Sequence, residues 1–181
     1  LETIPIDEAL TIAHKAVVPI NRTVKVTLAE ANGRVLASTV TALQDVPPFN
    51  RAAMDGYAVV AEDTFGANRQ NPCVLSRVET VHTGSVPTKH LTAGQCTQIA
   101  TGAPMPEGAN AVVMVEESEL SANGEVQVFI PVYPRQHVGR QGADISAGQI
   151  VLKPGVVLNP SRIGAIAALG LSDVSVFDKP T

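Results

Sequence analysis

The sequence predicts an α+β fold dominated by β-structure, in which a β-rich barrel-like or sandwich-like domain is inserted into a mixed domain flanked by helices. Helical periodicity occurs only near the two ends of the chain, at residues 7–19 and 159–170. Between them, short β-like runs alternate with Gly, Pro and Asn. With 181 residues, of which 45% are apolar, the chain is long enough to bury a core.

The first third of the chain is expected to hold one helix and three strands. Residues 7–19 place their apolar side chains on one helical face, with Asp7 as the expected N-cap and Pro19 as the stop. Alternating or continuous apolar runs then predict strands at residues 23–28, 34–43 and 56–60.

The middle block contains only strand patterns, and the last 40 residues change character again. The clearest middle strands are expected at residues 73–81, 95–100, 111–117 and 125–130. Asn123-Gly124 is a hairpin turn signal. In the final helix, Asn159 is the expected N-cap and Gly170 the left-handed stop, and residues 172–177 return to strand.

These patterns predict three parts: an N-terminal helix at residues 1–22, an inserted β-rich domain at 55–137, and a discontinuous mixed domain formed by 23–54 and 138–181. The chain begins without Met and stops soon after a strand, at Asp178-Lys179-Pro180-Thr181. We therefore expect more protein to follow.

Composition excludes several classes of partner. The net charge is −4, and no cluster of Lys and Arg offers a basic face to a phosphate backbone. Aromatic residues make up only 3%, so platforms for base stacking are not expected. No apolar run reaches the roughly 20 residues of a membrane span, and no signal peptide precedes the fold. A soluble protein without a nucleic-acid or membrane partner is expected.

Cysteine and histidine give no metal motif. Cys73 and Cys96 lack the spacing of a metal or redox site, so free buried thiols are expected, with a disulfide as the alternative. The histidines belong to unrelated segments, which favours unpaired residues over a metal pair; they are His14, His82, His90 and His137.

Three stretches join turn-forming residues to one reactive side chain. Asp55 lies in 52–56 (AAMDG), Thr101 and Gly102 lie in 100–110 (ATGAPMPEGAN), and Asp144 lies in 139–148 (GRQGADISAG). Gly and Pro fix the backbone without filling space, so a ligand can approach it closely. A carboxylate presented in this way can hold Mg²⁺ or act in acid/base steps, and a threonine hydroxyl can donate to an oxyanion. Taken singly, each stretch is also explained as a turn or a cap.

Taken together, these stretches resemble a known family. PPFNRAAMDGYAV, TGAPMPEGANAVVMVEE and GADISAGQIVLKPG, in this order and at these separations, are similar to the N-terminal region of the molybdopterin molybdenumtransferases, which include the E domain of gephyrin. The resemblance covers essentially the whole chain.

The resemblance implies a cytoplasmic homodimer that takes adenylylated molybdopterin and, in a step that depends on molybdate and Mg²⁺, releases AMP and the molybdenum cofactor. It implies a cleft between subunits, with Asp55 and Asp144 as catalytic residues and with Thr101 and Gly102 as substrate-binding residues. Asp55 is the candidate Mg²⁺ ligand, because a bare carboxylate repels molybdate and phosphate. The anions need donors such as Thr101, backbone N–H groups or a cation. Other proteins of the same biosynthesis are possible partners.

Two departures from the family pattern affect these expectations. Many members have serine where this chain has Ala52. The family's pterin-binding α/β domain and C-terminal β domain would follow residue 181, so the chain alone is expected to fold but to be inactive. The alternative is a non-catalytic dimerisation or scaffolding module of the gephyrin type, which should tolerate loss of Asp55.

Overall fold

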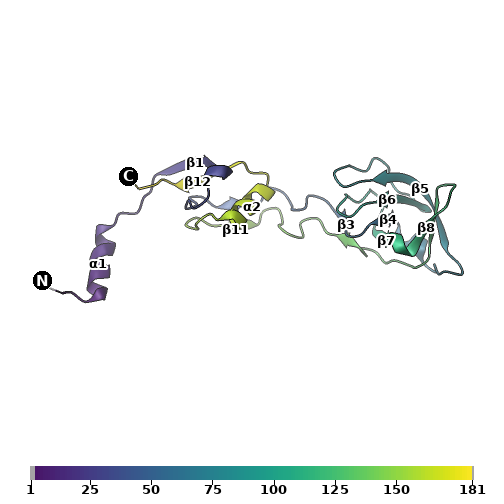
Figure 1. Ribbon diagram of the computed structural model, residues 1–181, viewed down its shortest axis with the longest axis horizontal. Coiled ribbons are helices and arrows are strands. Elements are labelled where there is room, and N and C mark those ends of the chain that lie inside the picture. The colour runs from purple at the N-terminus through teal and green to yellow at the C-terminus, as the bar shows by residue number, and fades with distance from the viewer. Residues whose placement is uncertain (1–2, 181) are drawn as a thin grey trace. The chain divides into compact units, whose positions relative to one another are not determined.

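The computed structural model describes residues 3–180 and divides into two compact units (Figure 1). Unit 2 is Leu43–Gly148, and unit 1 consists of the residues before and after it. Unit 2 extends beyond the predicted insert of residues 55–137 on both sides. The predicted segments 1–22 and 138–181 also include residues 1–2 and 181, which lie outside the described residues.

Unit 2 is longer than residues 55–137 because the chain segments on both sides of this range pair with each other. Strand β3 (Arg51–Ala52) pairs antiparallel with β10 (Val138–Gly139). Further out, the N–H of Val46 donates to the carbonyl of Ile145 over 2.8 Å. These backbone hydrogen bonds make the two connecting segments part of unit 2.

Unit 2 is built on a six-stranded curled sheet in the order β7-β4-β6-β5-β9-β8 (Figure 1). All its pairs are antiparallel except β5–β6, which is parallel. The strands are β4 (Gly56–Val59), β5 (Cys73–Val81), β6 (Gln95–Ile99), β7 (Ala111–Met114), β8 (Ser118–Leu120) and β9 (Glu125–Val128). The predicted class, mainly β with few helices, is confirmed.

Both faces of this sheet are buried around β4. Tyr57 and Val59 enter one apolar cluster, and Ala58 between them enters a second cluster on the other face. Ala52 of β3 and Ala103 also belong to the second cluster. Residues 47–54, here called the leader, are therefore fixed to the sheet by packing as well as by hydrogen bonds.

One hydroxyl in this core gives a stability prediction. Thr97 is fully buried, and its Oγ1 has no hydrogen-bond partner among the described residues. Replacing Thr97 with valine keeps the shape and removes the unsatisfied group, so the free energy of unfolding should rise by up to about 1 kcal/mol. Urea unfolding of the 181-residue chain measures the change.

Thr64 provides the matched control. It is equally buried, but its hydroxyl donates to Ala61 O over 2.7 Å and accepts from Val132 N over 2.9 Å. The Thr64→Val substitution should lower the free energy of unfolding by roughly 1–3 kcal/mol. Changes of the same sign in both variants would contradict the assignment of Thr97.

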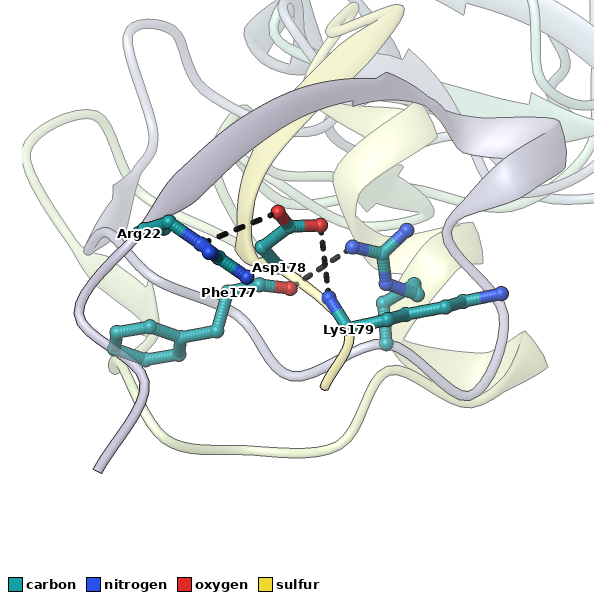
Figure 2. A network of polar contacts seen from close by, with 5 residues as sticks. Arg22, Phe177, Asp178 and Lys179 are labelled. Atoms are coloured by element: carbon teal, nitrogen blue, oxygen red, sulfur yellow. Dashed lines mark hydrogen bonds and ion pairs between the residues drawn. The ribbon is translucent and has the colours of Figure 1, made fainter. Parts of the chain in front are cut away.

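Unit 1 contains two strand pairs and helix α2 (Pro160–Ala168). Strand β1 (Thr23–Thr27) pairs antiparallel with β12 (Asp173–Phe177), and β2 (Val40–Thr41) pairs antiparallel with β11 (Ile150–Leu152). At the end of β12, Asp178 forms an ion pair with Arg22 at 3.7 Å and accepts from Lys179 N over 2.8 Å (Figure 2). The side chain of Arg34 donates to Phe177 O.

Short elements confirm several local predictions. Asn159 caps α2 by accepting from Arg162 N over 2.9 Å, and Gly170 has a φ of +78°. The turn that contains Asn123-Gly124 joins β8 to β9, and Gly124 donates its N–H to Ser121 O.

Cys96 is buried and Cys73 half-buried, and both thiols are free. Burial raises the pKa of Cys96 to about 12, which makes this thiol unreactive.

Two predicted elements are wrong in detail. Helix α1 (Ile6–Ala16) has Pro5 at its capping position without a side-chain cap, and Asp7 lies inside the first turn. None of its residues is buried. The strand expected at 34–43 is reduced to β2, because Leu36 N donates to Val156 O whereas Ala37 N donates to Ser175 O. A segment that changes partners at successive residues cannot build a continuous ladder.

No helix within residues 3–180 has the length and apolar character needed to span a membrane.

Candidate functional site

The three motifs meet at strand β3. Ala52 exchanges backbone hydrogen bonds with the second motif, donating to Ala103 O over 2.9 Å and accepting from Gly102 N over 2.8 Å. On its other side β3 pairs with β10 at the start of the third motif, and Ala53 N donates to His137 O. Segments that are distant in sequence therefore come together through the leader.

Asp55 and Thr101 are in direct contact. Asp55 Oδ1 accepts two hydrogen bonds, from Thr101 N at 2.7 Å and from Thr101 Oγ1 at 2.9 Å. These bonds lower the pKa of Asp55 below its ordinary value, because they favour the charged carboxylate. The bond from the backbone N–H has the larger effect, and the bond from the hydroxyl has the smaller one. No hydrogen bond to Oδ2 is found from any described residue, so that oxygen is open to a ligand.

Thr101 holds the Asp55 carboxylate in place. Both of the hydrogen-bond donors of Thr101, its backbone N–H and its hydroxyl, donate to Asp55 Oδ1. The Thr101 carbonyl accepts from Thr83 Oγ1 over 2.8 Å, and Gly102 follows with a φ of +84°, which favours glycine. Thr101 therefore fixes the carboxylate, and an anion would need other donors.

Asp144 occupies a different place. Its carboxylate lies 3.9 Å from the guanidinium of Arg51, and its backbone N–H donates to Val46 O. No hydrogen bond or ion pair joins Asp144 to Asp55 or Thr101 in the described part of the chain. Since β3 begins at Arg51, the ion pair with Arg51 ties Asp144 to the same leader as Asp55.

A second carboxylate, Asp45, holds the turn of the third motif. Asp45 accepts from Ala147 N over 2.8 Å and from the Gln141 side chain over 2.8 Å. These two bonds lower its pKa, and Arg140 contributes less. No local signal in the sequence marked Asp45, because it lies outside the three motifs and its partners, in the third motif, are about 100 residues away.

Asp55 also lines a pocket of about 170 Å³ within unit 2. Sequence reasoning missed three polar residues that also line it, Thr80, His82 and Gln98. Thr80 and Gln98 are register partners on β5 and β6, and His82 follows β5 directly. Only the strand pairing brings them beside Asp55, so no local signal could have identified them.

The donor set allows only a partial metal site. No group of three or more His, Cys, Asp or Glu residues able to hold a metal ion occurs within residues 3–180. Asp55 nevertheless offers one open carboxylate oxygen. Proteins often hold Mg²⁺ with one or two carboxylates, completing its shell with waters and substrate phosphates. Asp55 fits such a role.

The contact between Asp55 and Thr101 can be tested through the pKa of Asp55. In Thr101→Val the hydroxyl donor is lost and the backbone N–H remains, so the pKa of Asp55 should rise part of the way to its ordinary value. A ¹³C NMR titration of the carboxyl groups measures it. A lowered pKa stabilises the fold above the unfolded-state pKa, and this contribution is lost as the pH falls through the folded-state value.

Thr88→Val is the control. The Thr88 hydroxyl is the largest cause of the lowered pKa of Glu79. That substitution should raise the pKa of Glu79 and leave the pKa of Asp55 unchanged. An unchanged pKa of Asp55 in Thr101→Val would show that the hydroxyl does not hold the carboxylate.

Comparison with known proteins gives consistent matches. The family model described as "MoeA N-terminal region (domain I and II)" matches residues 4–170. A putative molybdopterin biosynthesis protein, MJ0666, from Methanocaldococcus jannaschii is 40% identical over 159 residues. Molybdopterin molybdenumtransferase 2 from Mycobacterium tuberculosis is 39% identical over 158 residues. Each alignment covers 87% of this chain but only 38% and 39% of the respective relatives.

The fold also matches a solved structure. The crystal structure of the molybdopterin biosynthesis moeA protein from Pyrococcus horikoshii OT3 aligns with a TM-score of 0.90 and 40% sequence identity. The match covers 99% of this chain and 47% of that chain. The chain thus spans less than half the length of these relatives.

Proposed function

This chain belongs to the MoeA family, of which it carries the N-terminal region (domain I and II), and from this membership we propose that it serves in molybdenum cofactor biosynthesis. It acts as the N-terminal part of an enzyme that inserts molybdate into adenylylated molybdopterin and releases AMP. The working protein is a cytoplasmic homodimer. The names of the relatives support the transferase class.

The observation that carries the proposal is the Asp55–Thr101 pair. Asp55 is exposed, lines a pocket, and is held as a carboxylate by two donors on one oxygen. A carboxylate with a lowered pKa is a weak base, so it is better suited to hold a cation or orient a water than to remove a proton. Thr101 and Gly102 provide the fixed turn that sets this geometry.

Bound Mg²⁺ would neutralise the charge of the phosphates and of the leaving group. The chain's own contribution is to place Asp55 Oδ2 toward such an ion or toward a water. Asp144 contributes by holding Arg51, and with it the leader, over 3.9 Å. Since Asp55 repels anions, the same arrangement predicts that molybdate and the phosphates contact other groups.

A chimera tests the proposal. Residues 4–170 of this chain would replace the matching region of the Mycobacterium tuberculosis relative, because the chain covers only 39% of that protein. The chimera should release AMP from adenylylated molybdopterin in a molybdate-dependent manner, whereas the 181-residue chain alone should not. A chimera that folds and binds the adenylate but releases no AMP would contradict the proposal.

A further inference from the structure

A second pocket of unit 2 is unlike the one that Asp55 lines. It has a volume of about 230 Å³ and is lined by Asn50, Met105, Ala109, Asn110, Arg135, Val138 and Arg140. It shares no lining residue with the Asp55 pocket. Its wall combines two guanidinium groups with apolar side chains and contains no acidic residue.

The two arginines form no close ion pair, although Arg140 interacts with the Asp45 carboxylate at longer range. Neither Arg135 nor Arg140 forms an ion pair within 4 Å with a described acid, and neither side chain donates a hydrogen bond to a described residue. Arg51, by contrast, is paired with Asp144. Two unpaired cations on one pocket favour an anionic ligand, because guanidinium groups bind phosphate-like oxyanions with paired N–H donors.

The asparagines differ in what they can still offer. Asn110 is engaged at both ends, since its Oδ1 accepts from Ala61 N over 2.7 Å and its amide donates to Glu62 over 3.2 Å. Asn50 uses only Oδ1, which accepts from Gln141 N over 2.9 Å. Its Nδ2 group bonds to no described residue and can serve as a third donor. Glu62 is the acid that contacts this wall, and Asn110 holds its carboxylate.

The backbone of the wall is held in an uncommon conformation. Arg135 and His137 have φ values of +71° and +56°, and no other non-glycine residue of the described chain has a positive φ. Backbone hydrogen bonds tie this segment to other parts of the unit: Arg135 N to Asn110 O, Val112 N to Gln136 O, and Ala53 N to His137 O. Such strain persists only where the surroundings impose it, and it concentrates at functional sites.

We propose that this pocket binds a tetrahedral dianion through Arg135, Arg140 and Asn50. The free oxyanion and the phosphate group of an ester share this chemistry. Because Met105, Ala109 and Val138 supply an apolar wall, an ester with an apolar group binds more tightly than the free ion. This inference does not depend on the proposed function, since it concerns binding at equilibrium without turnover.

Calorimetric titration of the 181-residue chain at low ionic strength tests the site with molybdate, inorganic phosphate and phenyl phosphate as probes. Phenyl phosphate should bind with the lowest Kd. Arg135→Gln and Arg140→Gln should each weaken binding at least about tenfold, which corresponds to the loss of one charge-assisted contact. Molybdate binding tighter than that of phenyl phosphate would overturn the role of the apolar wall.

Arg69→Gln is the matched control, because it removes the same charge from unit 2 at an exposed arginine that lies over Phe129. It should leave each Kd nearly unchanged. Backbone NMR spectra of each variant verify folding, and in the unchanged chain the shifts on titration should centre on Ala109 and Val138. No binding in the unchanged chain, or equal weakening in Arg69→Gln, would overturn the proposal.

Discussion

Replacing Asp55 with asparagine should lower molybdate-dependent AMP release by the chimera at least about 100-fold, the usual scale for loss of a positioned acid/base or metal-binding group. Asparagine keeps Oδ1 as an acceptor for Thr101 N and Oγ1, so the local fold should persist. The charge that would hold a cation or orient a water is removed. Thermal unfolding should therefore stay close to that of the unchanged chimera while turnover falls.

Glu119→Gln is the control for this experiment. Glu119 is an exposed carboxylate on β8 of the same unit, and its loss removes one negative charge away from the motifs. That variant should retain full turnover. Near-normal AMP release by Asp55→Asn would contradict the assignment of Asp55 as a catalytic residue and favour a non-catalytic module.

Replacing Gly56 with alanine should destabilise unit 2 by more than about 3 kcal/mol, at the upper end of what overpacking costs. A Cβ at this position would lie 1.9 Å from the carbonyl oxygen of Val113. Gly56 is on β4, between Met114 of β7 and Ile99 of β6, so neither neighbour can move without breaking the sheet. Urea unfolding followed by circular dichroism measures the loss.

Gly124→Ala separates this close contact from the general cost of removing a glycine. Gly124 has a φ of +87°, but a Cβ there meets no atom within 4 Å. The expected cost is the backbone strain alone, about 1–2 kcal/mol. Equal losses in the two variants would mean that the approach of β4 to β7 is not as close as described.

Local signals predicted the elements that local chemistry determines. Strand β5 has the predicted bounds of 73–81, and Asn159 caps α2 through its own side chain. Asn123-Gly124 likewise turns the chain within a few residues. In the cap and the turn, the decisive hydrogen bonds join sequence neighbours, so turn chemistry was sufficient. The apolar pattern of β5 predicted its range, although its ladder partners lie on β6 and β9.

Elements determined by distant partners could not be predicted in the same way. Residues 34–43 have a strand pattern, but their hydrogen bonds go to two different segments near the other end of the chain. Of the site, the motifs marked Asp55, Thr101 and Asp144, yet their spacing could not show that Thr101 holds Asp55 while Asp144 pairs with Arg51. His82 and Arg135 belong to no motif, and only folding places them on pockets.

The pairing of Val46 with Ile145, and of Asp45 with Ala147 across 102 positions, has a consequence for how the chain folds. The strand pairs of unit 1 join segments from the two ends of the sequence, so from an unfolded chain each would have to close a very long loop. Once unit 2 has folded, those bonds hold its two ends together and the loop is already closed. Unit 2 should therefore acquire hydrogen-exchange protection first during refolding, and unit 1 should follow rapidly.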